Sequence, residues 1–152
     1  GLARTFQTIR LFKELTVIEN VEVAAVSMGQ TRSQAREVAR ELLSEIGMED
    51  WGDRLASELP YGSQRKLEIA RALALRPKFL LLDEPAAGLN EEESDMMLAL
   101  LKDIPQHRRV GVLIVDHDMR LIMRLCDRLH VLNYGNTIAE ERRRKYAPTR
   151  PS

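Results

Sequence analysis

The sequence predicts an α/β fold built around a mostly parallel sheet. Two short apolar runs, residues 79–82 and 110–115, lack any alternation of apolar and polar residues, which is typical of parallel strands covered on both faces. Segments with helical periodicity lie before, between and after these runs, and this order indicates a parallel sheet. The first 60 residues are largely helical in pattern. We therefore expect two lobes, one helical and one that contains the sheet.

The composition limits the classes of protein that the chain can represent. Its 152 residues suffice for one domain, and 44% hydrophobic with 30% charged residues is an ordinary balance for a soluble protein. The 23 basic and 23 acidic residues cancel, which argues against a dedicated nucleic-acid binder. The single Cys126 excludes an internal disulfide and favours a reducing compartment. No apolar run reaches the roughly 20 residues of a membrane span, and the first residues do not resemble a signal peptide.

Three helices are predicted in the first half of the chain. Residues 1–18 have a mixed pattern, and residues 19–28 form a short helix. Thr31 with Gln34 makes a capping box that opens a second helix, which Gly47 ends. Residues 49–58 are predicted to form a loop with a helical turn around Trp51. A turn-like segment, residues 59–63, leads into the third helix at about residues 64–75, and Pro77 prevents its continuation.

The second half alternates predicted strands and helices. After the strand at residues 79–82, Asn90 is a good N-cap for a helix that runs to about Ile104. The strand at residues 110–115 leads into a helix at residues 119–126. Residues 129–132 and 137–139 are predicted strands, joined by a turn at residues 134–136. Residues 140–152 are predicted to be a polar, basic tail.

Acidic and imidazole groups follow both buried strands of the predicted sheet. Asp83-Glu84 ends the first strand, and Asp116-His117-Asp118 ends the second. Ligands of open parallel sheets bind beyond the carboxyl ends of the strands. One of the two adjacent carboxylates could hold a hydrated Mg²⁺ while the other polarises a water, as phosphoryl transfer requires, and His117 could contact a phosphate. The alternative is that the two acids cap the following segment and that His117 is an ordinary loop histidine.

Five segments, in this order, resemble motifs of ATP-binding-cassette (ABC) ATPases. They are Arg4-Thr5-Phe6-Gln7 (the Q-loop), Leu59-Pro60-Tyr61-Gly62-Ser63-Gln64-Arg65 with its following helix (the signature motif), Phe79-Leu80-Leu81-Leu82-Asp83-Glu84-Pro85 (Walker B), Ala86-Ala87-Gly88-Leu89-Asn90 (the D-loop) and Ile114-Val115-Asp116-His117-Asp118 (the switch histidine). The resemblance implies an α/β P-loop NTPase (RecA-like) parallel sheet, here incomplete, with an ABC-type helical subdomain.

The resemblance also implies roles for individual residues. Gln7 would help to bind Mg²⁺ and the attacking water, Asp83 would contact Mg²⁺ through water, and Glu84 would be the general base. His117 would contact the γ-phosphate of ATP. A further set would bind the nucleotide held by a partner subunit, with backbone donors of the signature motif at a helix N-terminus. This set is Pro60, Tyr61, Gly62, Ser63, Gln64 and Asn90.

The expected assembly follows from the same resemblance. ATP would lie between two such domains, so we expect a homo-oligomer, with a second ATPase subunit and transmembrane permease subunits as partners. The resemblance also implies no nucleic-acid partner, no direct membrane insertion, and a cytoplasmic location, peripheral to the inner face of the cell membrane when assembled. Segments such as Arg10-Leu11-Phe12 and Val131-Leu132-Asn133-Tyr134-Gly135 are more narrowly similar to the ATPase subunits of branched-chain amino-acid importers. Residues 1–139 would be a partial ABC ATPase domain, with the helical subdomain at about 12–76 and the catalytic core at about 77–139.

Three departures from the family pattern bear on activity. The printed sequence contains no P-loop string, G-x-x-x-x-G-K-[ST], so we expect an N-terminally truncated chain that binds ATP weakly and is inactive alone. Pro60 replaces the serine of the usual signature and brings neither a hydroxyl nor an N–H. The run Arg142-Arg143-Arg144-Lys145 replaces the family's continuation after Glu140, and a solvated tail is a better interpretation than a lipid contact.

Two other classes of function stay open. The first is a non-enzymatic, ABC-derived module that self-associates, because a sheet without its P-loop strand would leave an unpaired edge and uncovered apolar faces. The second is an ABC ATPase of DNA repair. Those proteins carry long coiled-coil insertions, whereas this chain has a compact helical segment and no basic excess.

Overall fold

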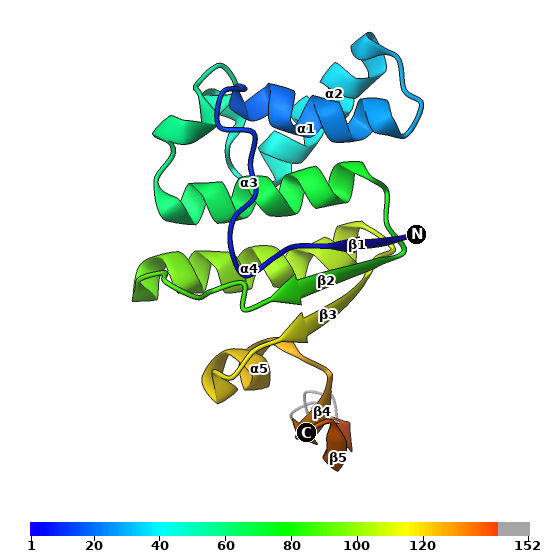
Figure 1. The fold of residues 1–152 in the computed structure, drawn as a ribbon, viewed down its shortest axis with the longest axis vertical. Helices are drawn as coiled ribbons and strands as arrows, with labels where there is room; N and C mark the ends of the chain where they lie inside the picture. The colour runs from blue at the N-terminus through cyan, green and yellow to red at the C-terminus, as the bar shows by residue number, and fades with distance from the viewer. Residues whose placement is uncertain (143–152) are drawn as a thin grey trace, which may run out of the picture. The chain divides into compact units, whose positions relative to one another are not determined.

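The computed structural model describes residues 1–142, in two compact units that divide between Asp116 and His117. Unit 1 contains strands β1, β2 and β3, helices α1 to α4, and two short 3-10 helices at Glu49–Trp51 and Ala56–Glu58 (Figure 1). Unit 2 contains helix α5 and strands β4 and β5. The short helix at Glu49–Trp51 confirms the helical turn predicted around Trp51.

A parallel sheet of three strands lies in unit 1, in the order β1-β2-β3. The central strand, β2 (Phe79–Asp83), pairs in parallel with β1 (Leu2–Arg4) and with β3 (Gly111–Val115). The predicted parallel sheet is therefore confirmed. Strand β1 was not predicted, because three residues are too few to show a period of two and only the pairing with β2 makes them a strand.

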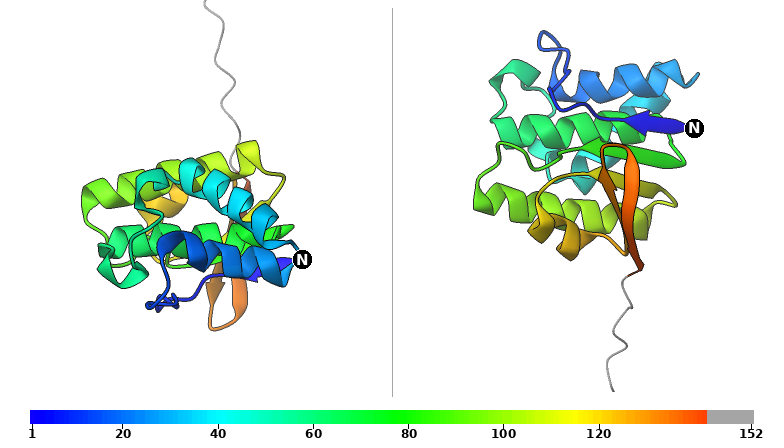
Figure 2. Two further views of the ribbon diagram at one scale, coloured as in Figure 1. Left: turned by 90° about the horizontal axis from the view of Figure 1, so that it is seen from above. Right: turned by 60° about the horizontal axis from the view of Figure 1, so that its bottom comes forward.

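The sheet is covered on one face only within unit 1. Leu80 and Leu82 are buried, whereas Phe79, Leu113 and Val115 are 59%, 56% and 60% exposed. Successive side chains of a strand alternate between faces, and the register places these three exposed residues on the face opposite to Leu80. Figures 1 and 2 show α4 on one side of the strands. The prediction that both strands are buried on both faces is wrong, since an unbroken apolar run shows only that both faces are apolar.

Capping side chains set the starts of the helices. The capping box of Thr31 with Gln34 opens α2 (Arg32–Glu45), and Asn90 with Glu93 makes a second one at α4 (Glu91–His107), both as predicted at these N-caps. Helix α1 (Val17–Ser27) begins earlier than predicted because Thr16 caps it. Helix α3 (Tyr61–Ala74) also begins before the predicted start at residue 64. The turn-like segment therefore ends at Pro60, and residues 61–63 form the first turn of the helix.

Helices α1, α2 and α3 pack together around a shared apolar core (Figure 1). Fully buried side chains of this core include Val17, Val21, Leu42, Leu67 and Leu73. The C-terminal end of α4 is joined to α2 by two hydrogen bonds from the Arg108 guanidinium to the Glu45 carboxylate, of 2.8 Å and 2.6 Å. A two-pronged bond of this kind holds both partners in one orientation.

Asn20, on α1, fastens the segment that follows the strand β1. The side chain is fully buried, and its Oδ1 accepts a hydrogen bond from the backbone N–H of Phe12 at 2.9 Å. Its Nδ2 lies within hydrogen-bonding distance of three carbonyl oxygens, those of Phe12, Leu15 and Thr16. A buried amide needs partners for its polar atoms, and here the backbone of residues 12–16 supplies them, so Asn20 stabilises the path of this segment.

Replacing Asn20 with Asp tests whether its hydrogen bonds to residues 12–16 stabilise the fold. The carboxylate still accepts from the Phe12 N–H, but it has no proton for the three carbonyl oxygens. We expect a loss of about 1–3 kcal/mol in the free energy of unfolding, which is the range for a buried unsatisfied polar group. Urea unfolding measures it. The matched change Asn136→Asp, at an exposed position, should stay within about 0.5 kcal/mol; an equal loss in both variants would contradict the assignment.

Unit 2 consists of α5 (Met119–Leu125) and an antiparallel hairpin of β4 (Arg128–Asn133) with β5 (Asn136–Arg142). The predicted strand pair is confirmed, and its turn contains Tyr134 and Gly135, both with positive φ. Strand β5 continues to Arg142 and so enters the stretch that was predicted to be a tail. The rest of that tail, residues 143–152, lies outside the described residues. Within residues 1–142, no helix has the length and apolar character needed to span a bilayer.

Candidate functional site

The two adjacent carboxylates lie at the carboxyl end of the central strand of unit 1. Asp83 is the last residue of β2, and Glu84 follows it with a φ of 46°, in the left-handed region. The backbone N–H of Glu84 donates to the Val115 carbonyl at 2.8 Å, which continues the pairing with β3. The left-handed backbone breaks the alternation of the strand, so the two acidic side chains do not simply point to opposite faces as strand neighbours do.

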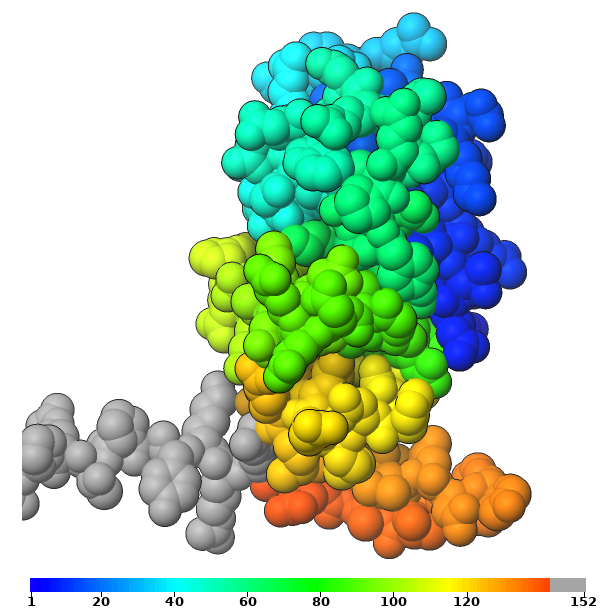
Figure 3. Space-filling view, turned by 90° about the vertical axis from the view of Figure 1, so that its left-hand side faces the viewer, coloured from blue at the N-terminus to red at the C-terminus, as the bar shows by residue number. Residues whose placement is uncertain are grey.

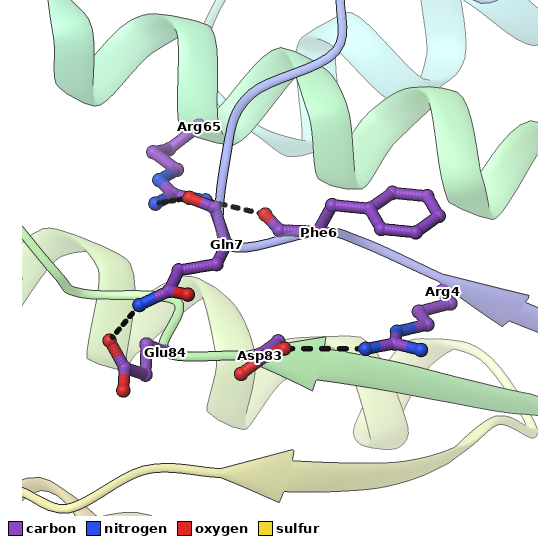
Figure 4. Close-up of polar contacts among 6 residues, drawn as sticks. All are labelled: Arg4, Phe6, Gln7, Arg65, Asp83 and Glu84. Atoms are coloured by element: carbon purple, nitrogen blue, oxygen red, sulfur yellow. Dashed lines mark hydrogen bonds and ion pairs between the residues drawn. The ribbon is translucent and has the colours of Figure 1, made fainter.

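Arg4, the last residue of β1, and Gln7, three positions further along, contact these acids through their side chains (Figure 4). The Gln7 Nε2 donates to Glu84 Oε2 at 3.1 Å, and the Arg4 Nη2 forms an ion pair with Asp83 Oδ2 at 3.4 Å. The N–H of Thr5, itself buried, donates to the Leu81 carbonyl at 2.9 Å, which carries the strand pairing one residue beyond β1. The pairing of β1 with β2 therefore places Gln7 close to the carboxyl end of β2.

The backbone of Gln7 is held by helix α3. The Arg65 guanidinium donates to the carbonyl oxygens of Phe6 and Gln7, at 3.0 Å and 2.6 Å, and also to the Tyr61 hydroxyl at 3.0 Å (Figure 4). Arg65 is only 3% exposed. One turn along the helix, the Glu68 carboxylate lies 3.7 Å from Arg65 Nη1. Burial raises the pKa of Glu68 above its ordinary value. The backbone N–H groups of Phe6 and Arg10 and the charge of Arg65 act in the opposite direction and only partly offset this rise.

The first turn of α3 contains most of the residues predicted to meet a nucleotide. Pro60 is the N-cap and supplies no side-chain hydrogen bond to the helix. Gly62 is buried, Ser63 is half-buried, and the Gln64 Nε2 donates back to the Leu59 carbonyl at 2.8 Å. The amino end of an uncapped helix presents backbone N–H groups and a positive dipole end, which suit an anion.

The same turn packs on the loop and helix that follow β2. A Cβ placed on Gly88 would lie 3.1 Å from the Tyr61 ring, and one on Gly62 would lie 2.8 Å from the Glu93 carboxylate. Gly88 has a φ of 78°, which also favours glycine. The Asn90 side chain accepts from the Glu93 N–H at 2.9 Å, so in this structure it caps α4. Figure 3 views this side of the molecule, with the segment near residue 60 above the segment near residue 90.

The predicted site residues therefore form two groups within unit 1. Gln7, Asp83 and Glu84 gather at the edge of the sheet, and the signature residues lie with Asn90 at the amino ends of α3 and α4. His117 belongs to unit 2, so its distance from the acids is not part of the geometry described here. The Asp118 side chain caps α5 by accepting from the Arg120 N–H at 2.8 Å. The chemical roles of these residues stay predictions.

Carboxylate and amide oxygens at the sheet edge are of the type that Mg²⁺ prefers, usually one or two carboxylates completed by water and phosphate oxygens. Asp83, Glu84 and Gln7 therefore fit such an ion in donor type. Among residues 1–142, no three or more His, Cys, Asp or Glu side chains form a group able to hold a metal. For a triphosphate, the described residues offer backbone N–H groups at the start of α3 rather than a P-loop.

Sequence reasoning missed three residues of this region: Arg4, Arg65 and Glu93. Arg4 was noticed only as part of a motif string, and its ion pair depends on a strand that was not predicted. Arg65 lies four residues after Tyr61, on one face of α3. This helical spacing of Tyr61 and Arg65 was the only signal in the sequence that the two side chains could contact each other. The contact of Glu93 with Gly62 had no signal in the sequence, because it depends on how two helices meet.

The left-handed backbone at Glu84 gives a stability test. A residue with a Cβ pays roughly 1–2 kcal/mol in this region and glycine does not, so Glu84→Gly should be more stable than Glu84→Ala by about 1 kcal/mol in urea unfolding. The matched pair at Glu92, in the first turn of α4, should give the reverse order, because alanine exceeds glycine in helix propensity. Equal stability of the two Glu84 variants would contradict the assigned backbone.

Comparison with known proteins adds independent information. The family model described as "ABC transporter" matches residues 1–87. The chain is 40% identical over 154 residues to the high-affinity branched-chain amino acid transport ATP-binding protein LivG of Escherichia coli K12, a match that covers 91% of this chain and 60% of LivG. It is 39% identical to BraF of Pseudomonas aeruginosa, named for the same transport, over 92% of this chain and 61% of BraF. The chain thus spans about 60% of the length of these relatives.

Solved structures show the same likeness. A dimeric, post-hydrolysis ATP-binding cassette bound to ADP and Pi superimposes with a TM-score of 0.80 at 28% identity, covering 95% of this chain and 64% of the other. The cbiO1 protein of Clostridium perfringens, part of an ABC transporter complex, gives a TM-score of 0.86 at 27% identity, covering 93% and 57%. These matches confirm the predicted α/β nucleotide-cassette fold.

Proposed function

The chain belongs to the ABC transporter family, as its motifs predicted, and from this we propose that it forms part of an ATPase subunit that couples ATP binding and hydrolysis to solute import. One observation carries the proposal: the 3.1 Å hydrogen bond from Gln7 to Glu84, beside Asp83 at the carboxyl edge of a parallel sheet. It joins two motifs that lie 77 positions apart in the sequence.

Branched-chain amino acids are the proposed solutes. LivG and BraF are named for high-affinity branched-chain amino acid transport, and the similarity to them extends over nine-tenths of this chain. In this proposal the subunit lies on the inner face of the cell membrane, pairs with a second ATPase subunit, and is attached to permease subunits. The dimeric cassette among its structural relatives supports the pairing.

The proposed chemistry assigns one task to each side chain. Mg²⁺, when bound, neutralises phosphate charge. Asp83 holds that ion through water, Gln7 orients the attacking water, and the Glu84 carboxylate accepts a proton from it. His117 contacts the γ-phosphate. The uncapped amides of the first turn of α3 face the nucleotide of the partner subunit, and Asn90 contributes to the same junction.

Hydrolysis by the 152 residues alone is not expected, because the printed sequence supplies no P-loop for the β- and γ-phosphates. The test therefore compares this chain with the same chain joined to the P-loop-bearing segment of LivG. Only the joined form should hydrolyse ATP with Mg²⁺. In the joined form, Glu84→Gln should reduce kcat by about 10²–10⁴-fold, the usual contribution of a general base.

Glu92→Gln is the matched control, since it makes the same change at an exposed position of α4. It should leave kcat within a factor of two of the parent, an order-of-magnitude expectation for a surface change away from the site. Turnover by the short chain that Glu84→Gln abolishes would contradict the proposed dependence on a P-loop. Full activity of the joined Glu84→Gln variant would remove Glu84 from the catalytic role.

A second candidate function is a module that self-associates. The observation in its favour is the open sheet face of unit 1, where Leu2, Phe79, Leu113 and Val115 are all exposed. Contiguous exposed apolar side chains on a sheet indicate a surface that another protein covers. A second copy of the chain is the proposed partner.

The oligomeric state of the chain, measured by light scattering, tests whether it self-associates. At micromolar concentrations we expect the chain to form a dimer or larger assembly, and Leu113→Asp to convert it to a monomer, because burying an unpaired charge in the contact is costly. Met96→Asp, at an exposed apolar position of α4, should leave the assembly unchanged. A stable monomer before mutation would contradict the module hypothesis.

A further inference from the structure

Beyond the residues expected to touch the nucleotide or Mg²⁺, the structure indicates a role for a residue that contacts neither. We propose that Arg65, together with Glu68, is the positioning residue that fixes Gln7 to helix α3. Under this proposal the amide that reaches Glu84 and the first turn of α3 change position together. The inference deepens the proposed function and rests on it where it concerns hydrolysis.

Arg65 contacts the backbone of the Gln7 segment and leaves its side chain available to Glu84. Its Nη2 donates to the Gln7 carbonyl at 2.6 Å, and its Nη1 donates to the Phe6 carbonyl at 3.0 Å. Two consecutive carbonyl oxygens are thus bound by the two terminal nitrogens of one planar group. Such a fork fixes the orientation of the peptide between the two carbonyls, which a single donor does not do.

Glu68 places a negative charge beside the same segment. Its carboxylate lies 3.7 Å from Arg65 Nη1, and the backbone N–H groups of Phe6 and Arg10 act to lower its pKa by favouring the charged form. The segment is therefore bound through its carbonyls by Arg65, and the negative charge of Glu68, three positions along the same helix, lies beside that guanidinium. The two residues are 3% and 6% exposed, so water does not compete strongly for these bonds.

The same guanidinium also contacts the first turn of α3. It donates to the Tyr61 hydroxyl at 3.0 Å and lies 5.4 Å from the centre of the Tyr61 ring. Tyr61 in turn packs on Gly88, in the loop that follows Glu84. One buried charge thus joins the Gln7 segment to the turn that would face the partner's nucleotide.

Amide hydrogen exchange on the 152-residue chain tests the attachment without nucleotide. In Arg65→Lys a single ammonium replaces the fork, so one carbonyl loses its donor. We expect the amides of Phe6 and Arg10 to exchange faster by on the order of tenfold, which matches the loss of one buried hydrogen bond. Amides in the middle of α2 and α4 should keep their rates.

Arg36→Lys is the matched control. Arg36 also forms an ion pair, with Glu22 at 2.9 Å between α2 and α1, and within residues 1–142 no hydrogen bond or ion pair joins it to the Gln7 segment. It should leave the rates of Phe6 and Arg10 unchanged. Unchanged rates in Arg65→Lys would overturn the proposal, and so would an equal acceleration across all helices of unit 1, since that would show general destabilisation only.

A second measurement addresses function in the joined form that contains a P-loop. Arg65→Lys should raise the Mg²⁺ concentration for half-maximal hydrolysis severalfold and leave the KM for ATP unchanged, because Gln7 is the group displaced. A fall in kcat with the Mg²⁺ dependence unaltered would contradict the positioning role. If the joined parent hydrolyses no ATP, the proposed function fails, whereas the exchange result still decides whether Arg65 fixes the segment.

Discussion

The buried guanidinium of Arg65 constrains the geometry of the whole candidate site. A charge with 3% exposure is costly unless it is paired, and here the two terminal nitrogens donate to the backbone of residues 6 and 7 and to Tyr61, whereas the buried Nε has no partner among the described residues. A chain segment without regular structure thereby receives bonds of the kind that a sheet would have provided. The position of Gln7 is thus held by Arg65 through the backbone, together with the strand pairing at Thr5 and the bond of its own side chain to Glu84.

The end of β2 supplies a second constraint, which is a strained backbone and not a paired charge. Regular strand geometry would have placed Glu84 on the opposite face from Asp83, and its φ of 46° prevents that at a cost in backbone energy. The bond from its N–H to Val115 holds this conformation in place. Strain of this sort is retained only where neighbouring structure enforces it, and here the N–H of Ala87 also donates to the Glu84 carbonyl, at 3.0 Å, while the Gln7 amide donates to the side chain.

How much the sequence could predict depended on how local each cause was. The capping box at Thr31 and the N-cap at Asn90 act within four residues, and both were predicted correctly. The gathering of Asp83 and Glu84 at a sheet edge followed from the rule for parallel strands. Strand β1 and the attachment of Gln7 depend on partners more than fifty positions away, for which a single sequence carries no pairing signal. The prediction that β2 and β3 are buried on both faces was wrong for the same reason, because burial depends on what covers the second face of the sheet.

Helix α3 is the element through which the two groups of site residues are joined. Its first turn packs on the loop after Glu84, through Tyr61 on Gly88, and its second turn binds the Gln7 segment through Arg65. A displacement of this helix relative to the sheet would therefore strain both contacts at once. Because the Gln7 side chain has a hydrogen bond to Glu84 while its backbone is bound to α3, the separation of helix and strand sets the length of that bond. The bond between Gln7 and Glu84 thus depends on the packing of α3 through Arg65, while the backbone of Glu84 depends on the pairing of β2 with β3.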